Sequence, residues 1–269
     1  MSATSRPAPP GPDRAVAVSA LGATRMTLAR TALDALVAVL LAPSCAVCGA
    51  SLEYPTTGPV CGRCWAAIVP TSPPLCDSCG DPLQSWRVIS ADTGRCARCR
   101  RTASALSSRR AIGEYAGTLR QILHALKYGR RRSLARPLAA MLRRHGSDLL
   151  QGDVMVVPVP LHRSRRHSRG FNQAAELARH LGFPVCHGLR RVRATRPQTD
   201  LPAGRRHANV RGAFALARRT SVRGTCVVLV DDVSTTGATL EACARVLREA
   251  GARDVRALTA ARVATRAQR

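Results

Sequence analysis

Aromatic residues are scarce in this chain, whose 269 residues include two Trp, three Tyr and three Phe. Lysine is scarcer still, because 41 of the 42 basic residues are arginine and the remaining one is Lys127. Sites that bind single-stranded nucleic acid without sequence preference usually interleave aromatic with basic residues. The shortage of aromatic residues therefore counts against a stacking platform for single strands.

Long apolar runs are also missing. The longest candidate, residues 35–42, lies between Asp34 and Pro43 and is far shorter than the roughly 20 residues that a membrane-spanning helix needs. We therefore predict no integral membrane association. No convincing secretory signal precedes the cysteines, so we expect a cytoplasmic protein. A hydrophobic fraction of 45% is enough for a buried core and excludes a wholly disordered chain.

Positive charge is concentrated in one part of the chain. Residues 98–223 hold 27 arginines and Lys127 against five acidic residues, and so carry +23 of the formal net charge of +26. Such a concentration predicts an anionic partner, which could be nucleic acid, a phosphate-rich metabolite or acidic lipid. The alternative interpretation is a solvated basic surface in a protein from a GC-rich genome.

Cysteine, in contrast, is abundant: there are eleven, and eight of them form four CxxC pairs within 55 residues. Two CxxC turns complete one tetrahedral shell of four sulfurs, so eight cysteines predict two structural Zn²⁺ sites. The predicted ligands are Cys45, Cys48, Cys61, Cys64, Cys76, Cys79, Cys96 and Cys99. Pairing in sequence order and interleaved pairing both remain open. The isolated Cys226 and Cys243 are predicted to be buried packing residues.

Composition and periodicity divide the chain into four regions. Residues 1–25 are predicted to be a disordered extension, 26–103 a helix plus a Cys-rich zinc module, 104–262 an α/β domain and 263–269 a basic tail. Within the α/β region, apolar runs predict strands at 111–115, 154–157, 226–230 and 255–258, separated by helical patterns. Residues 190–212 lack a period and are predicted to be a long loop. This alternation indicates a mainly parallel sheet flanked by helices.

The segment from Val227 to Thr239 combines several features of a ligand site. Asp231 and Asp232 follow a buried strand, at the end of the sheet where α/β proteins bind ligands. Gly237 would let the backbone approach a phosphate, and the next helix would direct its N–H groups at that anion. Hydroxyl donors surround the glycine. Carboxylates beside a phosphate cradle suit a ligand that also presents ribose hydroxyls and Mg²⁺.

This segment resembles the fingerprint of type I phosphoribosyltransferases, which bind 5-phosphoribosyl 1-pyrophosphate (PRPP) with Mg²⁺. The resemblance implies that Asp231 and Asp232 are catalytic residues that hold the ribose hydroxyls. It implies that Val233 belongs to the PRPP site and that the 5′-phosphate cradle consists of Ser234, Thr235, Thr236, Gly237, Ala238 and Thr239. It also implies a pyrophosphate loop at Val159, Pro160, Leu161, His162 and Arg163, and a mobile loop with candidates Arg196, Gln198, Arg206 and Asn209.

Over residues 26–262 the chain is similar to the ComF family. The motifs that carry this likeness are the CxxC module, Tyr115 with Leu126 to Gly129, Pro158 to His162 with Arg169 to Gln173, and Arg196 to Phe214. The likeness implies a link to natural transformation, with single-stranded DNA and competence-machinery proteins as partners. It leaves open whether Met1 or Met26 is the true start. Lys127 is either a point charge for phosphate or an exposed helix end.

The resulting hypothesis is a protein that binds Mg-PRPP and transfers phosphoribosyl to an unknown acceptor, with release of pyrophosphate. The alternative is a non-catalytic, PRPP-responsive competence factor or regulator that binds single-stranded DNA. Pyrophosphate release would favour the enzyme, and a steep salt dependence of DNA affinity would favour the binding protein.

Overall fold

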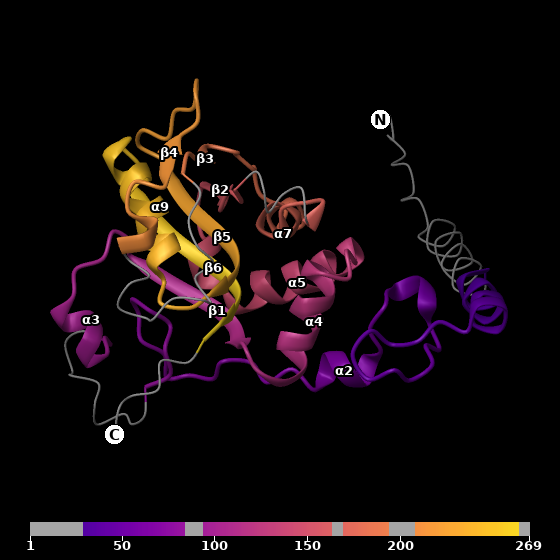
Figure 1. Cartoon of the computed structure of the whole chain (residues 1–269). Helices are drawn as coiled ribbons and strands as arrows, with labels where there is room; N and C mark the ends of the chain where they lie inside the picture. Colours follow the sequence, from indigo (N-terminus) through magenta and orange to yellow (C-terminus); the bar gives the residue numbers. More distant parts are fainter. Residues whose placement is uncertain (1–28, 84–93, 163–168, 194–207, 264–269) are drawn as a thin grey trace, which may run out of the picture. The chain divides into compact units, whose positions relative to one another are not determined.

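The computed structural model describes residues 29–83, 94–162, 169–193 and 208–263 (Figure 1). The chain divides into two compact units, one formed by Met1–Cys45 with Gly49–Cys61 and the other by Ala46–Cys48 with Gly62–Arg269. The predicted disordered extension and all of the basic tail beyond residue 263 lie outside the described residues. Within the described part, no helix is long and apolar enough to cross a membrane.

The first unit contains a helix over residues 29–41 and the short 3₁₀ helix η1 (Pro55–Thr57). Asp34 is 2% exposed, and its carboxylate accepts a hydrogen bond of 2.8 Å from the backbone N–H of Thr56. A buried carboxylate requires such a partner. This contact therefore holds the 29–41 helix against η1 within the unit.

The second unit is built on a four-stranded sheet in the order β1-β6-β5-β2. Its strands are β1 (Ser108–Glu114), β2 (Val154–Pro158), β5 (Cys226–Ser234) and β6 (Asp254–Arg262). Every pairing is parallel, as predicted. Residues 227–230 of the central strand β5 are fully buried, which is typical of a parallel sheet covered on both faces.

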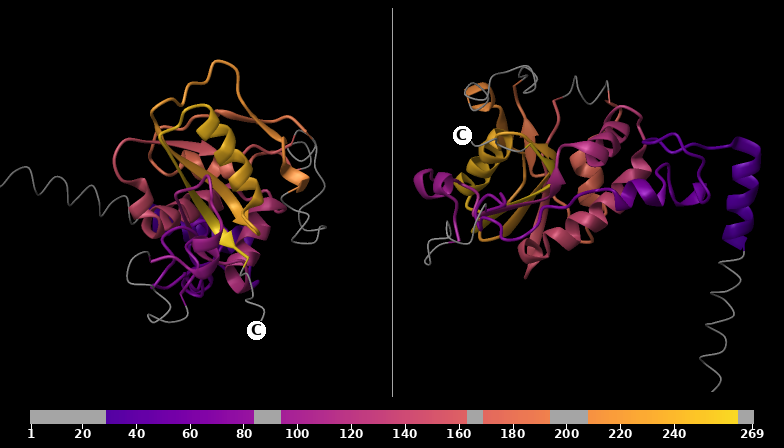
Figure 2. Two further views of the ribbon diagram at one scale, coloured as in Figure 1. Left: turned by 90° about the vertical axis from the view of Figure 1, so that its left-hand side faces the viewer. Right: turned by 90° about the horizontal axis from the view of Figure 1, so that it is seen from below.

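Helices cover both faces of this sheet (Figures 1 and 2). On one face lies α9 (Ala238–Glu249), whose Leu240, Cys243 and Leu247 pack with Leu229 of β5 and Ala257 of β6. The other face carries α4 (Gly117–Lys127), α5 (Ala135–His145) and α7 (Gln173–Arg179), together with the short 3₁₀ helices η3 (Arg132–Leu134) and η4 (Ser147–Leu150). Cys226 and Cys243 are buried in the core, as predicted. The parallel sheet with flanking helices is thus the predicted α/β architecture.

The sequence-based assignment was wrong in extent at several strands, and two of these differences bear on the site. The strand β3 (Leu189–Arg191) includes the first two residues of the predicted 190–212 loop and pairs in antiparallel fashion with β4 (Phe214–Leu216), so the connection between these strands begins at residue 192. Strands of three residues are too short to show a period, and two arginines stand in β3. The second difference is in β5, which continues past the predicted end at residue 230 to Ser234, because β6 pairs with it as far as Arg262. The two acids therefore lie within the strand rather than after it.

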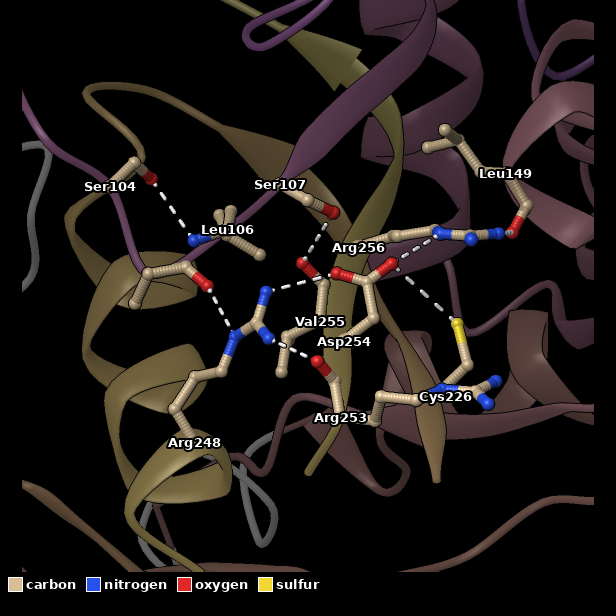
Figure 3. Close-up of polar contacts among 11 residues, drawn as sticks. Ser104, Leu106, Ser107, Leu149, Cys226, Arg248, Arg253, Asp254, Val255 and Arg256 are labelled. Carbon is tan, nitrogen blue, oxygen red and sulfur yellow. Dashed lines mark hydrogen bonds and ion pairs between the residues drawn. The ribbon is translucent and has the colours of Figure 1, made fainter. Parts of the chain in front are cut away.

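The amino-terminal ends of β5 and β6 are joined by a network around Asp254 (Figure 3). Arg248 Nη2 lies 2.9 Å from Asp254 Oδ1, and Arg256 Nε lies 2.8 Å from Oδ2. Arg256 Nη1 also donates to the carbonyl oxygen of Leu149 at 2.9 Å. Burial raises the pKa of Asp254, but hydrogen bonds and these guanidinium groups outweigh it, so the pKa is lowered overall. Asp254 therefore fastens α9, η4 and β6 together.

Candidate functional site

The eight predicted zinc ligands fall into two sets in sequence order. Within each set the sulfur atoms lie within 4.8 Å of one another, and the sets are Cys45, Cys48, Cys61, Cys64 and Cys76, Cys79, Cys96, Cys99. Interleaved pairing is thereby excluded. The same contact recurs in both sets: the N–H of the third cysteine donates to the sulfur of the first, at 3.4 Å from Cys61 to Cys45 and 3.3 Å from Cys96 to Cys76.

The second set, called here the second knuckle, shows why a cation fits. Burial opposes ionisation of Cys76, but N–H groups of Cys79, Cys96 and Ser78 outweigh it and lower the pKa of Cys76 to about 7. Burial, together with the charges of Asp81 and Cys76, raises the pKa of Cys79. A divalent ion offsets such crowding of thiolates. Four sulfur ligands with no open position suit a structural Zn²⁺.

Two consecutive residues near the carboxyl end of β5, Asp231 and Asp232, carry carboxylates. Successive side chains of a strand point to opposite faces, and Asp232 faces α4, where its Oδ1 lies 3.1 Å from Lys127 Nζ. Asp231 points the other way, and its Oδ1 accepts a hydrogen bond of 2.9 Å from the N–H of Asp232. Burial, and next the charge of Asp232, raise the pKa of Asp231 to about 7. Asp231 is thus held in a setting that disfavours its ionisation.

Lys127 is not an exposed helix end, so that interpretation was wrong. It is 8% exposed, and Asp232 is 9% exposed. Its Nζ also lies 5.6 Å from the centre of the Tyr115 ring, at a distance typical of a cation–π contact. The lone lysine of the chain is therefore the buried counter-ion of one of the two acids. Sequence reasoning singled out Lys127 but did not find this partner.

The hydroxyl-rich segment begins where β5 ends. Ser234 is the last residue of the strand, and Gly237 is the N-cap of α9 with a φ of 79°. That left-handed conformation favours glycine. A Cβ atom on Gly237 would collide with Arg109 Nη1, so the guanidinium of Arg109 lies directly against the turn. The N–H of Ala238 donates to Thr236 Oγ1 at 3.4 Å. Val233, Thr235 and Thr239 are partly buried around it.

The predicted pyrophosphate loop follows β2, and its first residue belongs to the core. The N–H of Val159 donates to the carbonyl oxygen of Val230 at 2.9 Å, and Asn172 Nδ2 donates to the carbonyl oxygen of Val159 at 3.0 Å. Both backbone groups of Val159 are therefore engaged, and Pro160 has no N–H. Leu161 and His162 are partly exposed beyond them. Arg163 lies outside the described residues.

The predicted mobile loop connects β3 with β4. Arg193 Nη2 donates to the carbonyl oxygens of Asn209 at 3.2 Å and of Arg211 at 2.7 Å. The N–H of Val192 donates to the carbonyl oxygen of Ala213 at 2.9 Å. These bonds join the residues that follow β3 to the residues that precede β4, and so hold the base of the loop together. The other candidates, Arg196, Gln198 and Arg206, lie outside the described residues.

Two motifs that are distant in sequence meet beside α4. The guanidinium of Arg169 lies 5.5 Å from the centre of the Tyr128 ring, and that of Arg132 lies 4.8 Å from the centre of the Phe171 ring. Arg132 Nη2 also donates to the carbonyl oxygen of Gly170 at 3.3 Å. Sequence reasoning named the two motifs separately and missed Arg132, whose place among several consecutive arginines gives no distinguishing signal.

Family models match two parts of the chain. Residues 36–100 match the double zinc ribbon domain, and residues 143–269 match the phosphoribosyl transferase domain. Together with the parallel sheet and the two sets of four cysteines, these matches define a phosphoribosyltransferase-type α/β protein with an N-terminal double zinc ribbon.

Similar proteins define the family more closely. Competence protein F of Haemophilus influenzae is 30% identical over 225 residues, which cover 78% of this chain and 93% of that protein. DNA utilization protein YhgH of Salmonella typhimurium is 33% identical, covering 73% of this chain and 87% of its own length. Competence protein ComFC of Bacillus subtilis is 28% identical, covering 71% and 79%. The chain belongs to the ComF family.

Proposed function

We propose that the protein binds Mg-PRPP at the carboxyl end of β5. The observation that carries this proposal is the order of groups there: two adjacent carboxylates, then the hydroxyls of 234–236, then Gly237 at the start of α9. The helix N-terminus and the hydroxyls suit a 5′-phosphate. Asp231 suits the ribose hydroxyls, because their hydrogen bonds would stabilise the ionised form that burial disfavours.

The proposed reaction is phosphoribosyl transfer to a nitrogen nucleophile. The nitrogen lone pair forms a bond to ribose C1 while the bond from C1 to the pyrophosphate oxygen breaks, and that electron pair leaves with pyrophosphate. The nitrogen then releases a proton to solvent. Mg²⁺ bound to PRPP would neutralise charge on the leaving pyrophosphate. Asp231 and Asp232 would orient the ribose and stabilise the positive charge that develops at C1.

The arginine-rich loops suit the other half of the ligand. Guanidinium groups form paired, charge-assisted hydrogen bonds with phosphate oxygens. The loop after β2, with Leu161, His162 and Arg163, would hold the leaving pyrophosphate. The loop between β3 and β4, with Arg196, Gln198 and Arg206, would close over the ligand and exclude water. Closure would hinge on the base held by Arg193.

The cellular role that we propose is in natural transformation in the cytoplasm, because the similar proteins are named for competence and DNA utilization. The charge of +23 on residues 98–223 supports a second candidate, a non-catalytic PRPP-responsive protein that binds single-stranded DNA. Both candidates share the ligand site. They differ in whether pyrophosphate is released.

Calorimetric titration of Mg-PRPP into the zinc-loaded full chain tests the shared site. We expect binding by the wild type and a loss of about hundredfold or more in Asp231→Asn/Asp232→Asn, because two charged hydrogen-bond acceptors are removed. Asp153→Asn is the matched control, because Asp153 is exposed and distant in sequence from the motif. Circular dichroism establishes that each variant is folded. No binding by the folded wild type would refute the PRPP site.

The two candidates are separated by a second pair of measurements on the same protein. Pyrophosphate release with a panel of amines and nucleobases supports the enzyme. Absence of release, together with an affinity for single-stranded oligonucleotides that falls steeply with salt and changes with PRPP, supports the regulator.

A further inference from the structure

A pocket within the second unit is lined from two sides. One side is the second knuckle, with Cys79, Asp81 and Arg98, and the other is the hydroxyl segment Ser234, Thr235 and Thr236. Side chains of β1 and β6, among them Arg109 and Arg262, complete the lining. The proposed 5′-phosphate cradle therefore borders a zinc-binding element that lies more than 130 residues earlier in the chain.

The second knuckle is fastened to the sheet at several points. Asp81 accepts hydrogen bonds from Arg262 at the end of β6 and from Arg98 Nη2 at 3.3 Å. Gly80 approaches β1 so closely that a Cβ atom there would collide with the carbonyl oxygen of Arg109. Arg110 Nη1 donates to the carbonyl oxygen of Asp77 at 3.2 Å. These contacts are specific enough to fix the knuckle in place beside the pocket.

The pocket has an excess of positive charge. It is lined by four arginines and one carboxylate, Asp81. Arg110 is paired outside the lining, with Asp148 at 2.7 Å. Arg109 lies against Gly237, at the positive end of the α9 dipole, and forms no ion pair with an acidic residue of the described chain. Hydroxyls, a helix N-terminus and excess guanidinium charge together suit a phosphate monoester.

The position of Arg98 depends on the metal site. It lies inside the fourth CxxC turn, between Cys96 and Cys99, on the short helix α3 (Ala97–Arg101). Because metal binding supplies folding free energy to small modules of this kind, we expect a bound ion at the four sulfurs to order the turn that presents Arg98. Loss of the ion would release Arg98 and the anchor at Asp81 together.

We propose that the second knuckle forms one wall of the phosphate pocket and that Arg98 contributes to binding the phosphate group. Metal occupancy of the second knuckle then controls the affinity for phosphorylated ribose. This inference rests on the proposed function for the identity of the ligand. It assigns the zinc ribbon a part in binding, beyond its own folding.

The test uses ribose 5-phosphate as the probe, because it carries the phosphate and hydroxyls without the pyrophosphate. Calorimetry on the zinc-loaded full chain compares wild type, Arg98→Gln and Arg101→Gln. Arg101 is the matched control: it lies on the same helix, is exposed, and its Nε donates to the carbonyl oxygen of Ala97. We expect Arg98→Gln to weaken binding about tenfold, as loss of one charge-assisted hydrogen bond implies, and Arg101→Gln to leave it unchanged.

Metal analysis of the variants measures whether the loss of affinity depends on zinc. Arg98→Gln should retain the wild-type zinc content, whereas Cys99→Ser should lose one ion and show at least the same loss of affinity. The arginine pair carries the test even if the cysteine variant fails to fold. Equal affinity in Arg98→Gln and Arg101→Gln would overturn the inference, as would a wild type that does not bind ribose 5-phosphate.

The outcomes also separate this inference from the proposed function. If Mg-PRPP binds wild type and Arg98→Gln equally, the PRPP site stands and the wall is refuted. If ribose 5-phosphate binding depends on Arg98 but Mg-PRPP is not bound, the wall stands and the PRPP assignment is refuted.

Discussion

Asp254, at the amino end of β6, and Asp231, near the carboxyl end of β5, lie in opposite electrostatic environments. At the amino end, Asp254 receives two guanidinium groups, and its pKa is lowered (Figure 3). At the carboxyl end, Asp231 stands beside a second acid, and burial raises its pKa to about 7. A carboxylate that is paired with guanidinium groups stabilises the fold, whereas a buried carboxyl group with a raised pKa is typical of a functional site.

Substitution of Lys127 should have the largest effect on stability, because Lys127 is the counter-ion of the buried Asp232 at the carboxyl end of β5. Lys127→Met leaves Asp232 buried without its cation, and removing one partner of a buried pair costs about 3 kcal/mol. Urea denaturation measures the change. Lys127→Met/Asp232→Asn should recover much of the loss, because the unpaired charge is gone. A single variant as stable as wild type would contradict the pairing.

The fold could be predicted from the sequence where the pattern is strong. Buried parallel strands read as continuous apolar runs, which located β5 and β6 but not their carboxyl ends. The ends depend on which strand pairs alongside, and the pairing of Ser234 with Arg262 has no local signal. The strands β3 and β4 were missed because runs of three residues are too short to show a period.

The candidate site was predictable in its residue types and less so in its contacts. Local chemistry singled out Asp231, Asp232 and Gly237 because several required groups coincide within a few positions. The partners Lys127, Arg109 and Arg98 come from other elements, at distances that only the folded chain sets. Because 41 of the 42 basic residues are arginine, the sequence also does not show which guanidinium groups face a pocket.

Asp254→Asn tests the comparison between Asp254 and Asp231 at the amino end of β6. It weakens two charge-assisted hydrogen bonds, so we expect a loss of about 1–2 kcal/mol in the free energy of unfolding. Affinity for Mg-PRPP should change less than about twofold, since Asp254 lies at the opposite end of β6 from the site. Chemical denaturation and calorimetry on the same preparation measure both quantities. A large loss of affinity without a loss of stability would reverse the roles assigned to the two ends.

The smallest expected effect is in pH dependence, where the two carboxylates should act with opposite sign. Asp254 has a lowered pKa, so its contribution to stability is present above its ordinary value of 3.8 and is lost as the pH falls below it. Asp231 has a raised pKa, so in the ligand-free protein the stability associated with its bound proton is lost as the pH rises from about 4 to about 7.

Ligand affinity should follow Asp231 in the direction opposite to its effect on stability. Ribose hydroxyls donate best to the ionised carboxylate, so affinity for Mg-PRPP should rise as the pH rises through about 7, by about tenfold at most per pH unit. The ligand's own phosphates titrate near pH 6, and Asp231→Asn removes the protein's part of the slope while keeping theirs. Calorimetry from pH 6 to pH 8 on both proteins isolates the difference. Identical slopes would mean that Asp231 is already ionised in the free protein, and the contrast with Asp254 would then lie in their partners alone.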